Sequence, residues 1–253
     1  MEKPLDNFVS GYSNTAIFRK IAFIGDSLSS GEFETVNEDG SHSYHDLYEY
    51  SWGQFLARKN GLTAYNFSRG GMTAKWYLES YADEKDLWNK EKACQAYVIA
   101  LGVNDVYNQK WPVGEKEDID KTEFEGERPF ISYYAELVRR YKEISPDAKF
   151  FFVTVPREYF RKVETTEKIV KAMYDLAEHF ENSYVIDLYK YGPVYDEEFV
   201  KKNFLLGHMT PSGYLFTANL IDSYIDYIIR TNPEDFKTVG FIGTDIKYKL
   251  QAI

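Results

Sequence analysis

The sequence has little of what builds disulfides, metal sites or membrane spans. Its 253 residues include one cysteine, Cys94, which excludes an intrachain disulfide and any Cys-based metal site, and which we interpret as an inert thiol. No apolar run approaches the ~18 residues of a transmembrane helix, and the first residues contain no apolar signal segment. We therefore expect a soluble, cytoplasmic protein without a membrane partner.

Basic residues are also scarce, since 30 Lys and Arg stand against 40 Asp and Glu and give a net charge of −10. A nucleic acid or an anionic membrane would be repelled over most of this surface, so a small neutral substrate fits better. The 44% hydrophobic content, with 22 tyrosines and 18 phenylalanines, excludes disorder. No repeat or linker divides the chain. We expect one domain over 1–253, with an N-terminal arm at 1–18 and a C-terminal extension at 232–253.

Continuously apolar segments alternate with amphipathic ones. We predict strands at 21–24, 62–67, 96–101, 150–155 and 184–187, and helices at 51–58, 130–144, 169–180 and from 211 onward. Connections too long for hairpins imply right-handed crossovers, so the expected fold is α/β, a three-layer α/β/α sandwich with a mostly parallel five-stranded sheet. We interpret 32–50 as a polar loop near the end of the first strand, and 239–243 as an edge strand or a surface segment.

Three of the predicted strands end in polar turns. Ser27 follows the first strand within Gly25-Asp26-Ser27, Gly71 follows the second strand, and Asn104 follows the third. Because the carboxyl ends of parallel strands meet at one edge of a sheet, we expect these residues to converge. His208 stands just before the last helix, which must return along the same sheet.

These residue types suit acyl transfer. A serine hydroxyl needs a base to take its proton, and imidazole has a suitable pKa. The backbone N–H groups of Ser27 and Gly71 and the amide of Asn104 would stabilise an oxyanion. Each residue also has a plainer role, as a helix cap, a turn or a surface histidine. The plainer roles do not explain why all four occur together at strand and helix ends.

The polar segments resemble the sequence blocks of the SGNH hydrolase superfamily, the GDSL-type lipases and esterases. They are Gly25-Asp26-Ser27-Leu28, Asn66 with Gly71-Met72-Thr73, Gly102-Val103-Asn104-Asp105, and His208 with Gly213-Tyr214. The resemblance implies a flavodoxin-like fold, Ser27 as nucleophile, His208 as base, and an oxyanion hole of Ser27, Gly71 and Asn104. It also implies ester hydrolysis without a metal or an organic cofactor.

One position departs from the family pattern. The family usually has Asp three residues before its histidine, and this chain has Leu205, which cannot orient an imidazole. Loss of such an acid can cost about 10⁴ in turnover, so an active enzyme needs a substitute. The candidates are a backbone carbonyl of 203–207, the loop acids Asp196, Glu197 and Glu198, and Asp187 at the end of the fifth strand. We favour the carbonyl or the loop acids.

The sequence therefore predicts a cofactor-free serine hydrolase that cleaves a small carboxylic ester, preferably a short-acyl or carbohydrate acetyl ester. The alternatives are a lysophospholipase or thioesterase, and a binding protein that has lost turnover with the missing aspartate. A phosphate-binding α/β protein fits least, because the first loop is poor in glycine. His42 and His45, with Asp46, lack the spacing of a helical metal pair, and we interpret them as loop residues.

Overall fold

Five parallel strands form the central sheet of the protein. The computed structural model describes residues 1–246, so the end of the predicted C-terminal extension lies outside the described residues. The strands are β1 (Lys20–Gly25), β4 (Thr63–Asn66), β5 (Ala96–Ala100), β6 (Lys149–Val153) and β7 (Ser183–Ile186). Their spatial order is β4-β1-β5-β6-β7, and every neighbouring pair is parallel. The strand order reverses at β1, which places a crevice at the carboxyl ends of β1 and β5.

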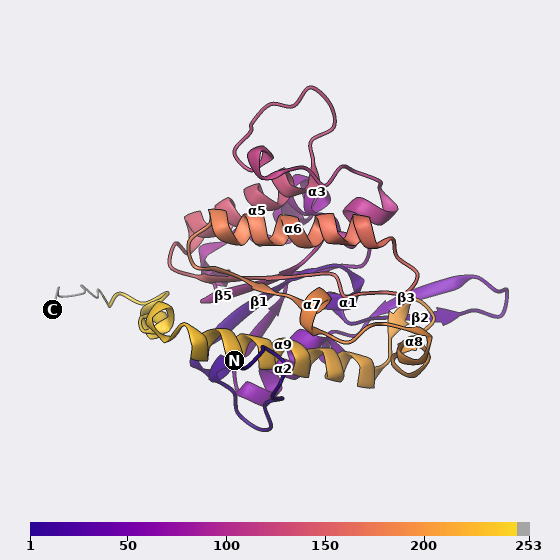
Figure 1. Cartoon of the computed structure of the whole chain (residues 1–253), viewed down its shortest axis with the longest axis horizontal. Coiled ribbons are helices and arrows are strands. Elements are labelled where there is room, and N and C mark those ends of the chain that lie inside the picture. The colour runs from indigo at the N-terminus through magenta and orange to yellow at the C-terminus, as the bar shows by residue number, and fades with distance from the viewer. Residues whose placement is uncertain (247–253) are drawn as a thin grey trace.

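Helices cover both faces of the sheet, as Figure 1 shows. On one face lie α2 (Trp52–Asn60) and α9 (Pro211–Thr231), and on the other α5 (Phe130–Ile144) and α6 (Val163–His179). Two separate apolar clusters fill the spaces between sheet and helices, which explains why the central strands are apolar on both sides. The predicted three-layer α/β/α sandwich is confirmed.

Shorter helices follow several strands. They are α1 (Ser27–Ser30), α3 (Ala74–Trp76), α4 (Ala82–Glu84), α7 (Leu188–Tyr191) and α8 (Glu197–Asn203). Helices α2 and α9, which cover the same face of the sheet, begin where the sequence predicts. Ser51 accepts the N–H of Gln54 at the start of α2, and Thr210 accepts the N–H of Gly213 at the start of α9.

The segment predicted as a polar loop is instead a β-hairpin. Strands β2 (Glu32–Val36) and β3 (His42–Asp46) pair antiparallel and project from the body of the protein (Figure 1). The hairpin packs against a second, two-residue pair, β8 (Phe204–Leu205) and β9 (His208–Met209). The strand pattern is hidden in the sequence because most side chains of β2 and β3 face solvent and lack apolar alternation.

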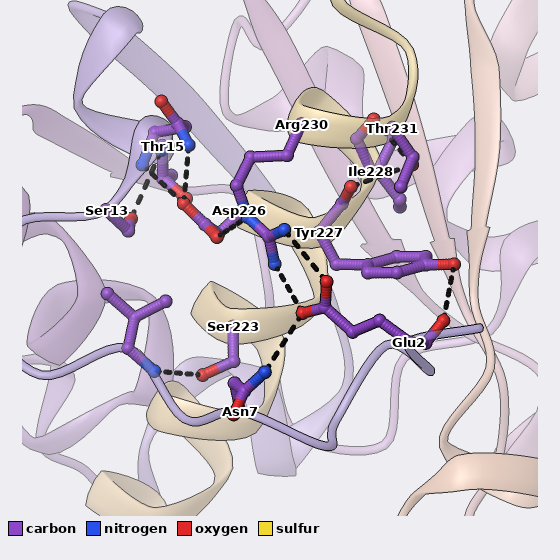
Figure 2. Close-up of polar contacts among 12 residues, drawn as sticks. Glu2, Asn7, Ser13, Thr15, Ser223, Asp226, Tyr227, Ile228, Arg230 and Thr231 are labelled. Atoms are coloured by element: carbon purple, nitrogen blue, oxygen red, sulfur yellow. Dashed lines mark hydrogen bonds and ion pairs between the residues drawn. The ribbon is translucent and has the colours of Figure 1, made fainter.

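The N-terminal arm packs along α9 through a series of polar contacts, drawn in Figure 2. The Asn14 backbone N–H donates to Asp226 at 2.8 Å, and the Val9 backbone N–H donates to the Ser223 hydroxyl oxygen at 3.2 Å. Near the other end of the chain, Val239–Phe241 forms a 3₁₀ turn rather than an edge strand, and Val239 is buried. Among residues 1–246, no helix has both the length and the apolar character needed to cross a membrane.

Candidate active site

Ser27 is the first residue of α1, directly after the end of β1. The Asp26 carboxylate caps this helix by accepting the Leu28 N–H at 3.1 Å. Gly25 permits the sharp exit from the strand, because a Cβ there would lie 2.2 Å from the Ser29 hydroxyl oxygen. The sequence Gly-Asp-Ser therefore turns the chain from strand to helix within two residues and leaves the serine at the rim of the sheet.

Asn104 connects the three strand ends that the sequence predicts to converge. Its Nδ2 atom lies 3.1 Å from the Met72 carbonyl oxygen and 3.4 Å from an Asp26 carboxylate oxygen. Asn104 begins a π-helical turn over Asn104–Asn108, a local geometry that often occurs at functional sites. Gly71 adopts φ +70°, which favours glycine, and a Cβ there would meet no atom within 4 Å. Gly71 is exposed and does not line the cavity beside Ser27, so the structure brings it near Asn104 only through its neighbour Met72.

His208 is held between two glutamates of the β2–β3 hairpin. Its Nδ1 atom lies 3.1 Å from Glu34 Oε2, and its Nε2 atom lies 3.0 Å from Glu32 Oε1. The imidazole is mostly buried, and the edge of the Tyr44 ring packs against it with centroids 5.7 Å apart. A neutral imidazole has only one N–H donor, so an imidazole that donates to both carboxylates carries a positive charge.

Glu34 accepts hydrogen bonds from three groups. Besides His208, the Gly207 backbone N–H donates to it at 2.8 Å, and the His42 imidazole contacts its other oxygen. Burial opposes ionisation of Glu34, but the hydrogen bonds from His42, Gly207 and His208 outweigh it and lower the pKa. Burial likewise opposes the charged form of His208, but the bonds to Glu32 and Glu34 outweigh it and raise the histidine pKa.

The acids proposed from sequence to orient His208 are engaged elsewhere, and this expectation is corrected. Asp196 caps α8 by accepting the Phe199 N–H at 2.8 Å, and Glu197 follows it on the same exposed helix. Glu198 pairs with Lys202 at 3.6 Å. Asp187 is buried, caps α7 and accepts the Tyr174 hydroxyl at 2.6 Å.

The predicted backbone-carbonyl partner for Nδ1 is likewise replaced, by the Glu34 carboxylate. Glu34 precedes His208 by 174 residues, so it lies far outside the segment that the family pattern directs attention to. The one local signal is that Glu32 and Glu34 are two residues apart, the spacing that places side chains on the same face of a strand. Sequence reasoning missed that signal because it interpreted 32–50 as a loop.

A cavity of about 250 Å³ lies beside Ser27 and Asn104. Much of its wall is apolar, with Trp52, Leu188 and Tyr195 among the lining residues. Gly207 and Met209, the neighbours of His208, also line it, because β9 packs beside α1. The Ser27 hydroxyl itself has no hydrogen-bond partner among residues 1–246. The arrangement brings a free hydroxyl, an amide donor and the histidine strand to one hollow, while Nε2 of the histidine is occupied by Glu32.

Two buried carboxyl groups, those of Asp26 and Asp105, lie at the ends of β1 and β5. Asp105 is fully buried, and one of its oxygens accepts the Ala74 N–H at 2.9 Å while the other has no partner in the described chain. Burial raises the pKa of Asp105 to about 7 and that of Asp26 to about 6. No group of three or more His, Cys, Asp or Glu side chains within residues 1–246 is arranged to hold a metal ion, and this includes the hairpin histidines.

Known proteins share the family pattern and the fold of this chain. A family model described as GDSL-like lipase/acylhydrolase matches residues 23–215. A search of curated proteins finds no match to the chain.

Several solved structures share the fold. A family two carbohydrate esterase from Clostridium thermocellum, in complex with cellohexaose, is 16% identical with a TM-score of 0.59, over 90% of this chain and 67% of that one. A putative lipolytic protein of the G-D-S-L family from Desulfitobacterium hafniense is 16% identical with a TM-score of 0.55, over 81% and 99%. A psychrotrophic esterase from Pseudoalteromonas sp., inhibited by monoethylphosphonate, is 13% identical with a TM-score of 0.57, over 84% and 99%.

Proposed function

The chain belongs to the GDSL-like lipase/acylhydrolase family and is an esterase of that family, and we propose that it cleaves a small carboxylic ester through an acyl-enzyme on Ser27. The observation that carries the proposal is that Ser27, whose hydroxyl has no hydrogen-bond partner among residues 1–246, and Asn104, with its amide donor, line one cavity at the ends of β1 and β5. Such a hollow at the carboxyl edge of an α/β sheet is where ligands bind in this architecture.

In the proposed reaction, the Ser27 hydroxyl oxygen forms a bond to the ester carbonyl carbon while His208 Nε2 takes its proton. Collapse of the tetrahedral intermediate breaks the bond to the alcohol oxygen, which leaves with that proton. A water molecule then repeats the sequence on the acyl-enzyme and releases the carboxylic acid. Over the whole cycle, one ester and one water molecule give one alcohol and one carboxylic acid, and Ser27 and His208 return to their starting protonation states.

The backbone N–H groups of Ser27 and Gly71 and the Asn104 amide are the proposed oxyanion donors. Gly71 suits this role because the space beside its Cα is open. The Asn104 amide has one short contact, to Met72, and one long contact of 3.4 Å, to Asp26. The long contact is the weaker of the two, so the hydrogen it uses is the one available to a developing oxyanion.

Glu34 is the proposed substitute for the aspartate that the family carries where this chain has Leu205. It accepts from Nδ1 of His208, which fixes the tautomer with Nε2 as the base, and it is itself held by Gly207 and His42. Glu32 has a different part in the proposal. Because it holds the Nε2 position, it must give way to Ser27 before the serine proton can be transferred.

The preferred substrates are short-acyl or carbohydrate acetyl esters. The cavity of about 250 Å³ suits a small acyl group better than a long one. A carbohydrate esterase shares the fold, and sugar esters are therefore the first class to test.

Hydrolysis of p-nitrophenyl acetate, butyrate and octanoate from pH 5 to 9 tests the proposal, together with labelling by a fluorophosphonate. We expect wild type to turn over acetate and butyrate faster than octanoate, and Ser27→Ala to lose both turnover and labelling. The exposed Ser212 provides a matched Ser→Ala control that should retain both. Turnover that survives in Ser27→Ala would refute the mechanism, and absence of both labelling and turnover in wild type would favour a binding protein on this fold.

A further inference from the structure

A second cavity of about 370 Å³ adjoins the one beside Ser27, and the two share the Arg161 side chain as a common wall. The second cavity is lined by three cations, Lys110, Arg161 and Lys162, together with residues that include Tyr107, Phe160 and Thr165. No carboxylate lines it among the described residues. In a chain with a net charge of −10, three cations around one hollow are a marked local reversal of charge.

Arg161 is held in a fixed orientation at this wall. Its Nε atom forms an ion pair with Glu158, whose side chain is only 6% exposed, and its guanidinium lies over the Tyr107 ring at 4.6 Å. The Phe160 ring is 5.3 Å away. Glu158 therefore takes the Nε edge of the guanidinium. The two terminal nitrogens have no hydrogen-bond partner within residues 1–246.

A guanidinium with its terminal nitrogens free matches the geometry of an oxyanion such as a carboxylate, which can accept from both nitrogens at once. The charges divide unevenly between the two hollows. Glu158 lines the cavity beside Ser27 and offsets Arg161 there, whereas Lys110 and Lys162 add to its charge in the second cavity. An anion is therefore favoured on the far side of Arg161, away from the Ser27 hydroxyl.

The π-helical turn links the two hollows. Asn104 at its start lines the cavity beside Ser27, and Tyr107 in the same turn lines the second cavity and bonds the Lys162 carbonyl at 3.1 Å. The cavity beside Ser27 and the second cavity are therefore joined both by this turn and by the shared Arg161 side chain.

We infer that the second cavity is a subsite for an anionic group on the substrate, so that the enzyme prefers esters that carry a carboxylate a few bonds from the ester carbonyl. The inference rests on the proposed function only in taking Ser27 as the point where the ester binds. Arg161 is the specificity residue, and Lys110 and Lys162 raise the local concentration of anions.

Binding to the inactive Ser27→Ala protein tests the subsite separately from catalysis. Monomethyl succinate and methyl butyrate differ mainly in a carboxylate, and isothermal titration compares their affinities. We expect monomethyl succinate to bind at least about tenfold more tightly, which corresponds to about 1.4 kcal/mol. Equal affinities would overturn the inference, whatever the outcome of the hydrolysis experiments.

Substitutions in the Ser27→Ala background locate the preference. Arg161→Gln should abolish it, and Arg161→Lys should restore part of it, because lysine keeps the charge but not the two-pronged geometry. Arg157→Gln is the matched control, since Arg157 is an exposed arginine of the same loop that lines neither cavity. A preference that survives Arg161→Gln would also overturn the inference.

Loss of Arg161 leaves the buried Glu158 unpaired, so misfolding has to be separated from loss of the subsite. The double variant Lys110→Gln/Lys162→Gln serves this purpose, because both lysines are exposed. We expect it to reduce the preference for monomethyl succinate several-fold while thermal unfolding stays unchanged. If Arg161→Gln unfolds and the double lysine variant still prefers monomethyl succinate as strongly as the parent does, the second cavity is not the anion subsite.

Discussion

The edge of the sheet and the β2–β3 hairpin contribute to the same site by different physical means. At the sheet edge, Ser27 and Asn104 are placed by the ends of buried strands, and their positions follow from the backbone of the core. At the hairpin, His208 is placed by carboxylates on a strand that is largely exposed. The nucleophile and its donors thus depend on packing, whereas the base depends on ionisable hydrogen bonds.

This difference teaches where the site is rigid and where it responds to conditions. The buried strands respond less to pH, because most of their side chains are apolar. His42, Glu34, His208 and Glu32 form a chain of three successive contacts between ionisable side chains, so the geometry and the charge of this network change together. We expect variants of Ser27 and Asn104 to lower turnover at every pH, and variants of the hairpin glutamates to alter the pH dependence as well.

The largest effect is expected from Glu34→Gln. Loss of the carboxylate leaves His208 free to adopt the wrong tautomer, and turnover should fall by up to about 10⁴-fold. Glu198→Gln is the matched control, because Glu198 is one of the three acids at 196–198 that the sequence offered for this role, and the variant should keep full activity. Measured kcat for short p-nitrophenyl esters decides between them. A larger loss in the Glu198 variant would return the orienting role to the loop.

Asn104→Ala should have the next largest effect. Removal of one oxyanion donor typically costs about 10²–10³ in kcat, and here the loss should be the same at every pH, because no titrating group is removed. Asn108→Ala is the control, since the Asn108 amide donates to the side-chain oxygen Oδ1 of Asn104 at 2.6 Å and is not itself a proposed oxyanion donor, so its loss should lower kcat far less. An Asn104 variant with normal kcat and raised KM would show that the amide binds the ground state instead.

Glu32→Gln should change the pH dependence of activity, which separates the hairpin from the sheet edge. His208 acts as base only when neutral, so activity rises as pH passes the histidine pKa, which Glu32 and Glu34 hold above its ordinary value. Removing the Glu32 charge should lower that pKa and move the acidic limb of the kcat/KM profile down by on the order of one pH unit. A Lys202→Gln variant, away from the histidine, should leave the limb in place. An upward shift would contradict the assigned role of Glu32.

The smallest effect concerns a buried acid below the sheet edge. The folded-state pKa of Asp105 is about 7, above its unfolded value, so its favourable contribution is present below about pH 4 and is lost as pH rises through 7. Asp105→Asn should therefore raise the melting temperature at pH 8 by about 2–4 °C, and by less at pH 5. Asp118→Asn is the control, because Lys121 lowers the Asp118 pKa, and that variant should show no gain. Thermal unfolding at both pH values tests this.

The strands and long helices were predictable because each is encoded locally. Continuous apolar runs gave the strands, and Ser51 and Thr210 marked the starts of the two helices that they cap. The hairpin was not predictable in this way. Strand β2 buries one side chain and β3 buries none, so the alternation of apolar and polar residues that marks a half-buried strand is missing. Asp196 and Glu198 were candidates because they are close to His208 in the sequence. In the structure Asp196 caps α8 and Glu198 pairs with Lys202.

The sequence by itself determined the layers of the fold and the family, and it placed Ser27, Gly71 and Asn104 after the ends of strands, because each of these features is encoded in a short run of neighbouring residues. Only the tertiary structure decided which carboxylates hold His208 and which cations surround the second cavity. Those contacts join segments up to 174 residues apart. The residues next to a charged side chain in the sequence do not reveal which partner it contacts after folding.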